Sequence, residues 1–137
     1  MHLSTLILAP LLILAAAAQP DCTRADHYKP GSTAIYMPFR GNSIECELGI
    51  DNNNNGVKAL QEQINLCYGR YLDAKLSVDG DFGPKTRTAV RVVQGRVGAQ
   101  VDGRYGPETR GLMNWGVYFN GNPSDVVCKT LAKWRSS

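Results

Sequence analysis

The side chains that could support catalysis are few and widely separated in this sequence. His27 is the only histidine after the first eighteen residues, and its neighbours offer no partner to position it as a general base. Carboxylate pairs exist, such as Asp79 and Asp81, but glycoside hydrolysis needs a cleft and one carboxyl group with a raised pKa. No cysteine or histidine spacing matches a zinc site. The sequence therefore predicts a protein that is not an enzyme and that holds no cofactor or metal.

One stretch does match a metal-binding pattern. Asp51, Asn53, Asn55, Gly56 and Glu62 satisfy the loop pattern of EF-hand calcium sites. Only two of these residues are carboxylates, no helix is expected before the stretch, and a helix is expected to begin inside it. Asparagines commonly precede helices because their side chains cap the N-terminus. We therefore interpret the stretch as a helix lead-in and not as a calcium site.

The elements that would position these side chains are organised by an internal repeat. Residues 78–87 read VDGDFGPKTR, and residues 101–110 read VDGRYGPETR, with seven of ten positions identical at a register of 23 residues. In each copy Asp-Gly favours a turn, the aromatic residue can enter the core, and Gly-Pro favours the start of a helix. The repeat predicts two equivalent loops, with the structural turn residues Asp79, Gly80, Phe82, Gly83, Asp102, Gly103 and Gly106.

The repeat also extends upstream of each loop. Residues 57–61 (VKALQ) match residues 90–94 (VRVVQ), and each segment ends in a glutamine, Gln61 or Gln94. These glutamines adjoin core positions, where an amide must be hydrogen-bonded, so we expect them to bond the backbone of the turns. The first unit carries ten extra residues around 69–77.

Apolar spacing predicts three helices, over residues 56–68, 84–97 and 107 to about 115. Gly69 and Gly98 are expected to end the first two helices, and Leu112 is expected to be buried in the third. The predicted fold is an all-α three-helix bundle with pseudo-two-fold symmetry, a small disulfide-linked N-terminal hairpin and a C-terminal tail.

Residues 56–115 resemble the small three-helix peptidoglycan-binding domains that accompany many bacterial wall hydrolases. The matching features are Leu60-Gln61, the two Asp-Gly-x-(Phe/Tyr)-Gly-Pro-x-Thr stretches, Val93-Gln94 and Gly98. The resemblance implies a shallow groove near the two loops as the ligand site. Arginine can pair with carboxylates of the polymer and aromatic faces can stack on its sugars. The candidate ligand-binding residues are Arg87, Arg91, Arg104, Tyr105 and Trp115.

The first eighteen residues have the features of a signal peptide. Residues 6–18 form an apolar run too short to span a bilayer, and Ala16 to Ala18 supply small residues for cleavage. We expect a secreted, extracellular protein that begins near Gln19. The predicted organisation is a signal peptide over 1–18, an N-terminal extension over 19–55, the repeat domain over 56–115 and a tail over 116–137.

Four cysteines in an exported chain predict two disulfides, and three pairings are possible. We favour Cys46–Cys67 and Cys22–Cys128. In the extension, residues 34–39 and 44–48 are expected to form a hairpin around residues 40–43, with Pro38 on an edge. In the tail, Ser124 is expected to cap a short helix with its apolar side chains on one face, namely Val127, Leu131 and Trp134.

The leading functional hypothesis is a secreted, non-catalytic module that binds peptidoglycan or a related amino-sugar polymer of the cell wall. The alternative is a protein-interaction scaffold, an inhibitor or effector, that uses Tyr71, Tyr118 and Trp134 as its surface. A small wall hydrolase is the third and least favoured hypothesis. No nucleic acid partner and no membrane span are expected.

Calcium is predicted to leave the stability of the protein unchanged. Millimolar calcium should not shift the melting temperature relative to the same concentration of magnesium, because a ligand that does not bind the folded state cannot stabilise it. A rise of several degrees with calcium alone, measured by thermal denaturation, would show that residues 51–62 form a calcium loop.

Overall fold

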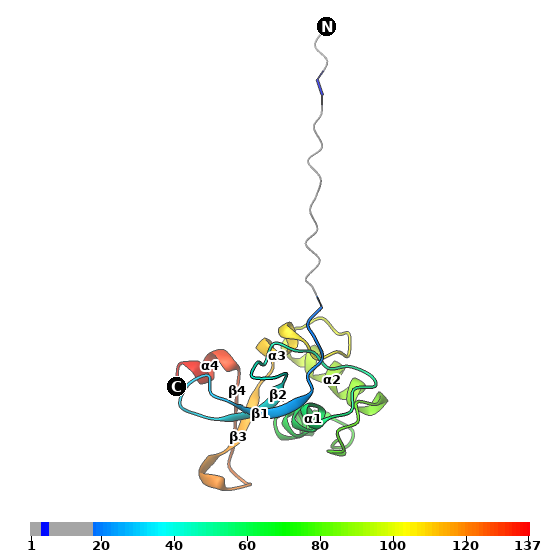
Figure 1. The fold of residues 1–137 in the computed structure, drawn as a ribbon. Coiled ribbons are helices and arrows are strands. Elements are labelled where there is room, and N and C mark those ends of the chain that lie inside the picture. Colours follow the sequence, from blue (N-terminus) through cyan, green and yellow to red (C-terminus); the bar gives the residue numbers. More distant parts are fainter. Residues whose placement is uncertain (1–3, 6–17) are drawn as a thin grey trace.

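The computed structural model describes residues 4–5 and 18–137, so the predicted signal peptide lies almost entirely outside the described residues. The secondary structure elements in chain order are β1 (Arg24–Tyr28), β2 (Ile35–Phe39), α1 (Asn55–Tyr68), η1 (Gly69–Tyr71), α2 (Pro84–Val97), α3 (Pro107–Leu112), β3 (Trp115–Tyr118), η2 (Phe119–Gly121), β4 (Val126–Lys129) and α4 (Leu131–Arg135). Figure 1 shows helices α1 to α3 on one side of the molecule, with the two hairpins and α4 beside them. The prediction of an all-α bundle is wrong, because two antiparallel two-stranded sheets flank the helices.

The helix starts follow from local chemistry. The Asn54 side chain accepts a hydrogen bond from the backbone N–H of Val57 at 3.2 Å and so caps α1. Pro84 and Pro107 are the first residues of α2 and α3, where a missing N–H costs nothing. Gly98 ends α2 as predicted, in the left-handed conformation at φ 76°.

Helix α1 ends at Tyr68 with Gly69 as its C-cap, as predicted, but Gly69 is right-handed, with φ −54°, and the chain continues into the 3₁₀ turn η1. The end of the third helix differs from the prediction. Helix α3 stops at Leu112, whose side chain is 43% exposed, and Trp115 begins strand β3 instead of ending a helix. The extended backbone from Met113 onward is what directs the Met113 and Trp115 side chains into the core.

The N-terminal hairpin contains one of the two predicted strands, because β2 lies within residues 34–39, but its partner is not residues 44–48. Strand β1 pairs antiparallel with β2, with Arg24 opposite Phe39 and Tyr28 opposite Ile35. Residues 40–43 do form a tight turn, but residues 44–48 do not return along β2, because Leu48 exchanges two backbone hydrogen bonds of 2.9 Å with Tyr105. The sequence does not indicate strand β1, because the polar side chains of Arg24–Tyr28 give no alternating pattern.

The C-terminal tail forms a second hairpin followed by a short helix. Strands β3 and β4 pair antiparallel from Trp115 opposite Lys129 to Tyr118 opposite Val126. Val127 therefore lies in a strand and not in the predicted helix, and Thr130, not Ser124, caps α4. The indole N–H of Trp134 donates to the Trp115 carbonyl at 2.9 Å, which fixes α4 against β3.

Both disulfides form, but the favoured pairing is wrong. The bonds are Cys22–Cys46 and Cys67–Cys128. The first pair is brought together by a hydrogen bond of 2.8 Å from the Cys22 N–H to the Glu47 carbonyl. The second pair meets over Gly116, where an added Cβ would lie 2.8 Å from the Cys67 sulfur and 3.0 Å from the Cys128 sulfur. One bond therefore closes the extension on itself, and the other ties the tail to the end of α1.

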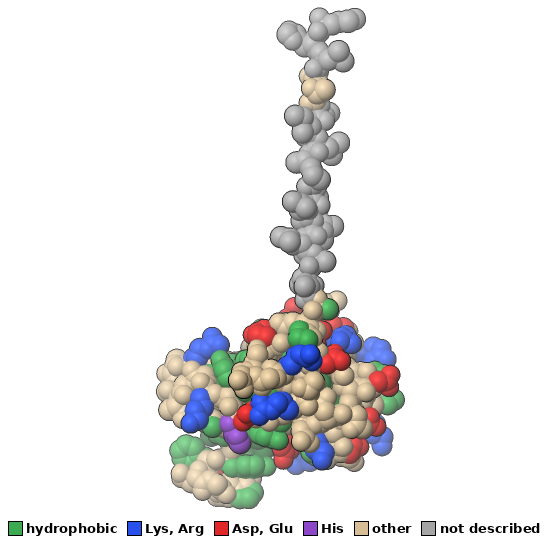
Figure 2. Space-filling view, in the orientation of Figure 1, with side chains coloured by type: hydrophobic (Ala, Val, Ile, Leu, Met, Phe, Trp, Pro, Cys, Tyr) green, Lys and Arg blue, Asp and Glu red, His purple; other side chains and the backbone are tan. Residues whose placement is uncertain are grey.

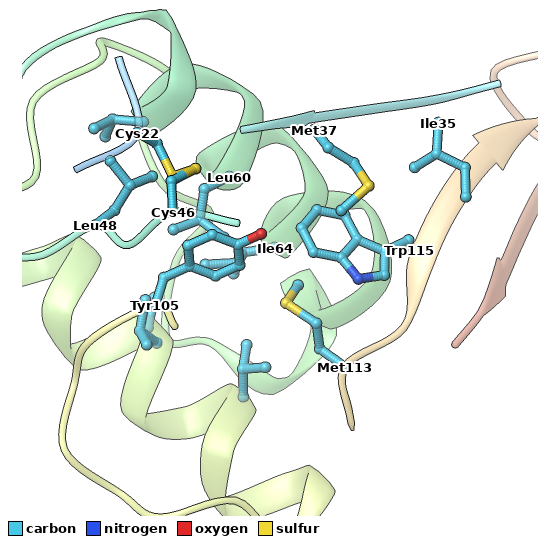
Figure 3. Close-up of a cluster of buried hydrophobic side chains, with 14 of the residues drawn as sticks. Cys22, Ile35, Met37, Cys46, Leu48, Leu60, Ile64, Tyr105, Met113 and Trp115 are labelled. Atoms are coloured by element: carbon cyan, nitrogen blue, oxygen red, sulfur yellow. A yellow bond between two sulfur atoms is a disulfide. The ribbon is translucent and has the colours of Figure 1, made fainter. Parts of the chain in front are cut away.

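The extension, the repeat and the tail share one hydrophobic core. Figure 3 shows Met37 and Ile35 from β2, Ile64 from α1 and Trp115 from β3 pointing toward one cluster. The Trp115 and Tyr105 rings meet edge to face, with centroids 6.0 Å apart. Within the part of the chain that the structure describes, no helix has the length and apolar character needed to cross a bilayer.

Truncation of either loop aromatic should cost stability to a similar extent. Phe82 and Tyr105 are both buried in the core, so Phe82→Ala and Tyr105→Ala should each destabilise the protein by about 3–5 kcal/mol in chemical denaturation. This corrects the expectation that the Tyr105 hydroxyl reaches solvent and that its truncation costs less. The variant Tyr105→Phe is the control: its hydroxyl has no hydrogen-bond partner among the described residues, so the melting temperature should stay equal or rise. A large loss in Tyr105→Phe would contradict this account of the core.

Candidate functional site

The first loop of the repeat is held by one buried glutamine. The Gln61 amide nitrogen donates to the Asp79 carboxylate at 3.0 Å and to the Asp81 carbonyl at 3.1 Å. Its amide oxygen accepts from the N–H groups of Asp79 and Gly80, at 3.1 Å and 2.9 Å. The expectation that this side chain bonds the turn backbone is confirmed.

The second loop is held in the same way by Gln94. Its nitrogen donates to the Asp102 carboxylate at 2.8 Å and to the Arg104 carbonyl at 2.9 Å, and its oxygen accepts from the N–H groups of Asp102 and Gly103. A threonine hydroxyl from the following helix completes each set: Thr86 lies 3.1 Å from the Gln61 nitrogen, and Thr109 lies 3.0 Å from the Gln94 nitrogen. The pseudo-symmetry read from the sequence therefore extends to individual hydrogen bonds.

The turn aspartates are engaged within their own loops. The Asp79 carboxylate accepts from the Asp81 N–H and from Gln61, and these hydrogen bonds hold the pKa of Asp79 below its ordinary value. Asp102 accepts the matching bond from the Arg104 N–H at 2.9 Å. Both carboxylates thus act as structural acceptors, as the turn chemistry predicts.

The side chains that lie against the two loops differ in charge. A Cβ added to Gly103 would come within 2.7 Å of Arg87 Cγ and 3.2 Å of Arg91 Nε, so both arginines lie directly on the second loop. A Cβ added to Gly80 would meet Lys58 Cγ and the Asn54 carbonyl, both at 3.1 Å. Two arginines therefore cover the second loop, where a single lysine covers the first.

The sequences of the loops increase this difference in positive charge between the second loop and the first. Arg104 follows Gly103 in the second loop, whereas Asp81 occupies the equivalent place in the first. The Arg104 side chain is 55% exposed and pairs with Glu47 at 3.5 Å. Neither Arg87 nor Arg91 is in an ion pair within the described part of the chain. We call Arg87, Arg91 and Arg104 the arginine face.

A small hollow lies beside the arginine face. It has a volume of about 130 Å³ and is bounded by Glu47, Gln100, Arg104, Pro107 and Glu108. The Gln100 N–H donates to the Glu108 carboxylate at 2.5 Å across its edge. A hollow of this size, lined by the three acidic residues Glu47, Asp102 and Glu108, can accept a small polar group but not a sugar ring.

The structure separates the five sequence-predicted ligand residues into two groups. The three arginines are exposed around one loop, but Tyr105 and Trp115 are completely buried and offer no face to a ligand. Burial raises the pKa of the Tyr105 hydroxyl well above its ordinary value, and the nearby Arg110 guanidinium offsets only part of that rise. The equivalence of Tyr105 with Phe82 in the repeat was the signal that Tyr105 belongs to the core.

Two asparagines that lie between the residues of the calcium-loop pattern have structural roles. Asn54 caps α1 and also donates to the Cys22 carbonyl at 2.9 Å, while the Asn52 side chain accepts from the Gly49 N–H at 2.8 Å. Among residues 4–5 and 18–137, no three metal-ligating side chains are grouped so that they could hold an ion.

A comparison with models of protein families gives a match that covers the repeat. Residues 53–113 match the family model described as "Putative peptidoglycan binding domain". The matched segment contains both loops, both glutamines and all of α1, α2 and α3, whereas the two hairpins and α4 lie outside it. No curated protein matches the chain.

We call the hydrogen bonds of Gln61 and of Gln94 to their loops the glutamine clamps. Loss of either glutamine clamp should destabilise the fold. Gln94→Ala leaves the Thr109 hydroxyl and the loop N–H groups without partners, so it should cost about 2–4 kcal/mol in chemical denaturation. Gln61→Ala should cost a similar amount, because its hydrogen bonds are equivalent. The exposed Gln100→Ala is the control and should change little. If Gln94→Glu, which keeps the shape but loses the donors, were as stable as the original protein, the donor bonds would not matter.

Proposed function

Residues 53–113 form a domain of the peptidoglycan-binding family, and from this premise we propose that the chain is a secreted, non-enzymatic protein that binds peptidoglycan through the arginine face. The observation that carries the proposal is the charge difference between two loops of equal backbone structure. Because the hydrogen bonds of Gln61 and Gln94 hold both loops, the arginines are not needed for the loop structure. Arg87 and Arg91 are in no ion pair among the described residues, and Arg104 pairs only with Glu47.

The chemistry of the arginine face fits the anionic groups of peptidoglycan. Guanidinium groups form charge-assisted, bidentate hydrogen bonds with carboxylates, which the polymer carries on its muramyl groups and peptide stems. Arg87 and Arg91 extend from α2, and Arg104 extends from a clamped loop, so all three are held by ordered backbone. Since the surface is shallow, the affinity of a single domain should be weak and retention should depend on the many equivalent sites of the polymer.

Secretion is supported by the predicted signal peptide and by the two disulfides. Disulfides persist in oxidising compartments such as the extracellular space. The non-enzymatic role is supported by the matched family, which is one of binding domains, and by the engagement of Asp79 and Asp102 in their turns.

A second candidate function, protein interaction, is favoured by the tip of the β3–β4 hairpin. Figure 2 shows hydrophobic side chains gathered over this hairpin, and Tyr118 and Phe119 are 54% and 56% exposed. Trp134, proposed from the sequence as part of such a surface, is buried, and Tyr71 packs against Arg70 and Arg96. A protein partner would therefore contact Tyr118 and Phe119.

The purified mature chain should co-sediment with insoluble peptidoglycan and not with cellulose. The double variant Arg87→Ala/Arg91→Ala should bind about tenfold more weakly, because two exposed charge contacts are lost. Its melting curve should be unchanged, and salt should weaken binding of the original protein.

The matched control removes the same charge elsewhere. Lys133→Ala/Arg135→Ala on α4 should bind like the original protein, since both residues lie outside the family domain. If both double variants bound peptidoglycan equally weakly, the loss would be due to the lower net charge of the protein and not to the arginine face. Release of reducing ends or free amines from the polymer would contradict the non-enzymatic role, and absence of sedimentation would favour the protein-interaction function.

A further inference from the structure

The repeat produces a second hollow, equivalent in position to the one beside the arginine face. Gln100, Pro107 and Glu108 bound the small hollow, and residues 23 positions earlier, Ser77, Pro84 and Lys85, bound the second. The second hollow has a volume of about 420 Å³, against about 130 Å³ for the first. The two hollows therefore share these three repeat positions at a helix start, but they differ in their other lining residues and in size.

The larger hollow owes its additional volume to the extra residues around 69–77, which the first repeat unit has and the second lacks. Residues 71–77 form one wall, and the outer surface of α2 forms the other. The Asn65 side chain donates to the Leu76 carbonyl at 2.8 Å and accepts from the Leu76 N–H at 2.7 Å. This pair of hydrogen bonds fixes the wall to α1, so little order would have to be gained on binding.

Tyr71 fixes the other end of the wall. The Arg96 guanidinium lies 3.9 Å from the centre of its ring, and the Arg70 guanidinium lies 4.8 Å from it. With two guanidinium groups already packed against it, the ring is poorly available for stacking on a sugar. The wall thus adds shape and positive charge, but not the open aromatic surface that a glycan-binding groove needs.

The lining of the hollow is apolar, with basic groups at its edge. The apolar side chains are those of Leu72, Leu76, Ala89 and Val92. Lys75 and Lys85 are exposed at the edge, and Asp73 is the one acidic residue that lines the hollow. Together with Arg70 and Arg96 nearby, these residues favour a ligand with a small apolar body and a negative charge.

The equivalent hollow lacks this combination. Lys85 has Glu108 as its counterpart at the second helix start, and Glu47 adds a further carboxylate there. The larger hollow therefore has a lysine where the small hollow has a glutamate, and the small hollow combines Arg104 with three carboxylates, those of Glu47, Asp102 and Glu108.

We propose that the larger hollow binds a short peptide with small aliphatic side chains and a free carboxylate. The inference rests on the proposed function and specifies it: this site would receive the peptide stem of peptidoglycan, while the glycan strand stays outside. Alanine-sized side chains fit the floor of Leu72, Leu76, Ala89 and Val92, and the carboxylate lies toward Lys85.

The test is a titration of the full mature chain with free stem peptide released from peptidoglycan, followed by NMR or calorimetry. The peptide should bind, its carboxyl-amidated form should bind several-fold more weakly, and glycan strands stripped of peptide should not bind at this site. Lys85→Glu, which introduces the residue type of the equivalent hollow, should weaken peptide binding by about fivefold or more.

The matched control is Glu108→Lys, which makes the opposite change in the small hollow and should leave peptide binding unchanged. Both residues are exposed, and Lys85→Glu should leave the melting curve unchanged. Glu108→Lys should lower the melting temperature slightly, because the Gln100 N–H loses its acceptor. Equal affinity of Lys85→Glu and the original protein for the peptide would overturn the inference.

Co-sedimentation with intact peptidoglycan, run in parallel, separates the two levels of the proposal. Retention on the polymer without binding of the free stem peptide would overturn the stem-peptide site alone and leave the arginine face as the binding surface. Loss of both would overturn the proposed function together with the inference.

Discussion

The structure depends above all on the hydrogen bonding of two buried glutamines. Gln61 and Gln94 each satisfy a turn aspartate, two loop N–H groups, one loop carbonyl and a threonine hydroxyl of the next helix. A buried amide that lost these partners would carry the full desolvation cost, so loop and helix are held together as a unit. The aromatic residue beside each clamp, Phe82 or Tyr105, then enters the core at a fixed place.

The segments outside the repeat complete its core and are not appendages. Met37 from the N-terminal hairpin and Trp115 from the C-terminal one lie in the cluster that contains Tyr105, and Leu48 pairs with Tyr105 through the backbone. A three-helix unit of about sixty residues buries too little surface to be very stable alone. The two hairpins and the two disulfides supply the missing burial and restrict the unfolded chain.

The internal repeat also provides a comparison within one chain. Where the two halves agree, as in the glutamine clamps, the shared residues explain the fold. Where they differ, the difference points to function: Arg104 against Asp81 at the loops, and Lys85 against Glu108 at the helix starts. The arginine face and the larger hollow both use side chains of α2, and the positive charge at each suits the anionic polymer that we propose as the ligand.

The sequence by itself determined the two loops, the starts of all three repeat helices, the end of α2 and the role of the glutamines. Each depends on contacts between residues close in the chain, such as proline at a first helical position or glycine at positive φ. Only the tertiary structure decided the pairing of Arg24–Tyr28 with β2, the bonds Cys22–Cys46 and Cys67–Cys128, the end of α3 and the burial of Tyr105 and Trp115. These features depend on which distant segments meet. Neither the polar side chains of a strand nor the spacing of the cysteines indicates which segments those are. For the same reason, three of the five predicted ligand residues lie on the surface as expected, while the two aromatic ones are used by the core.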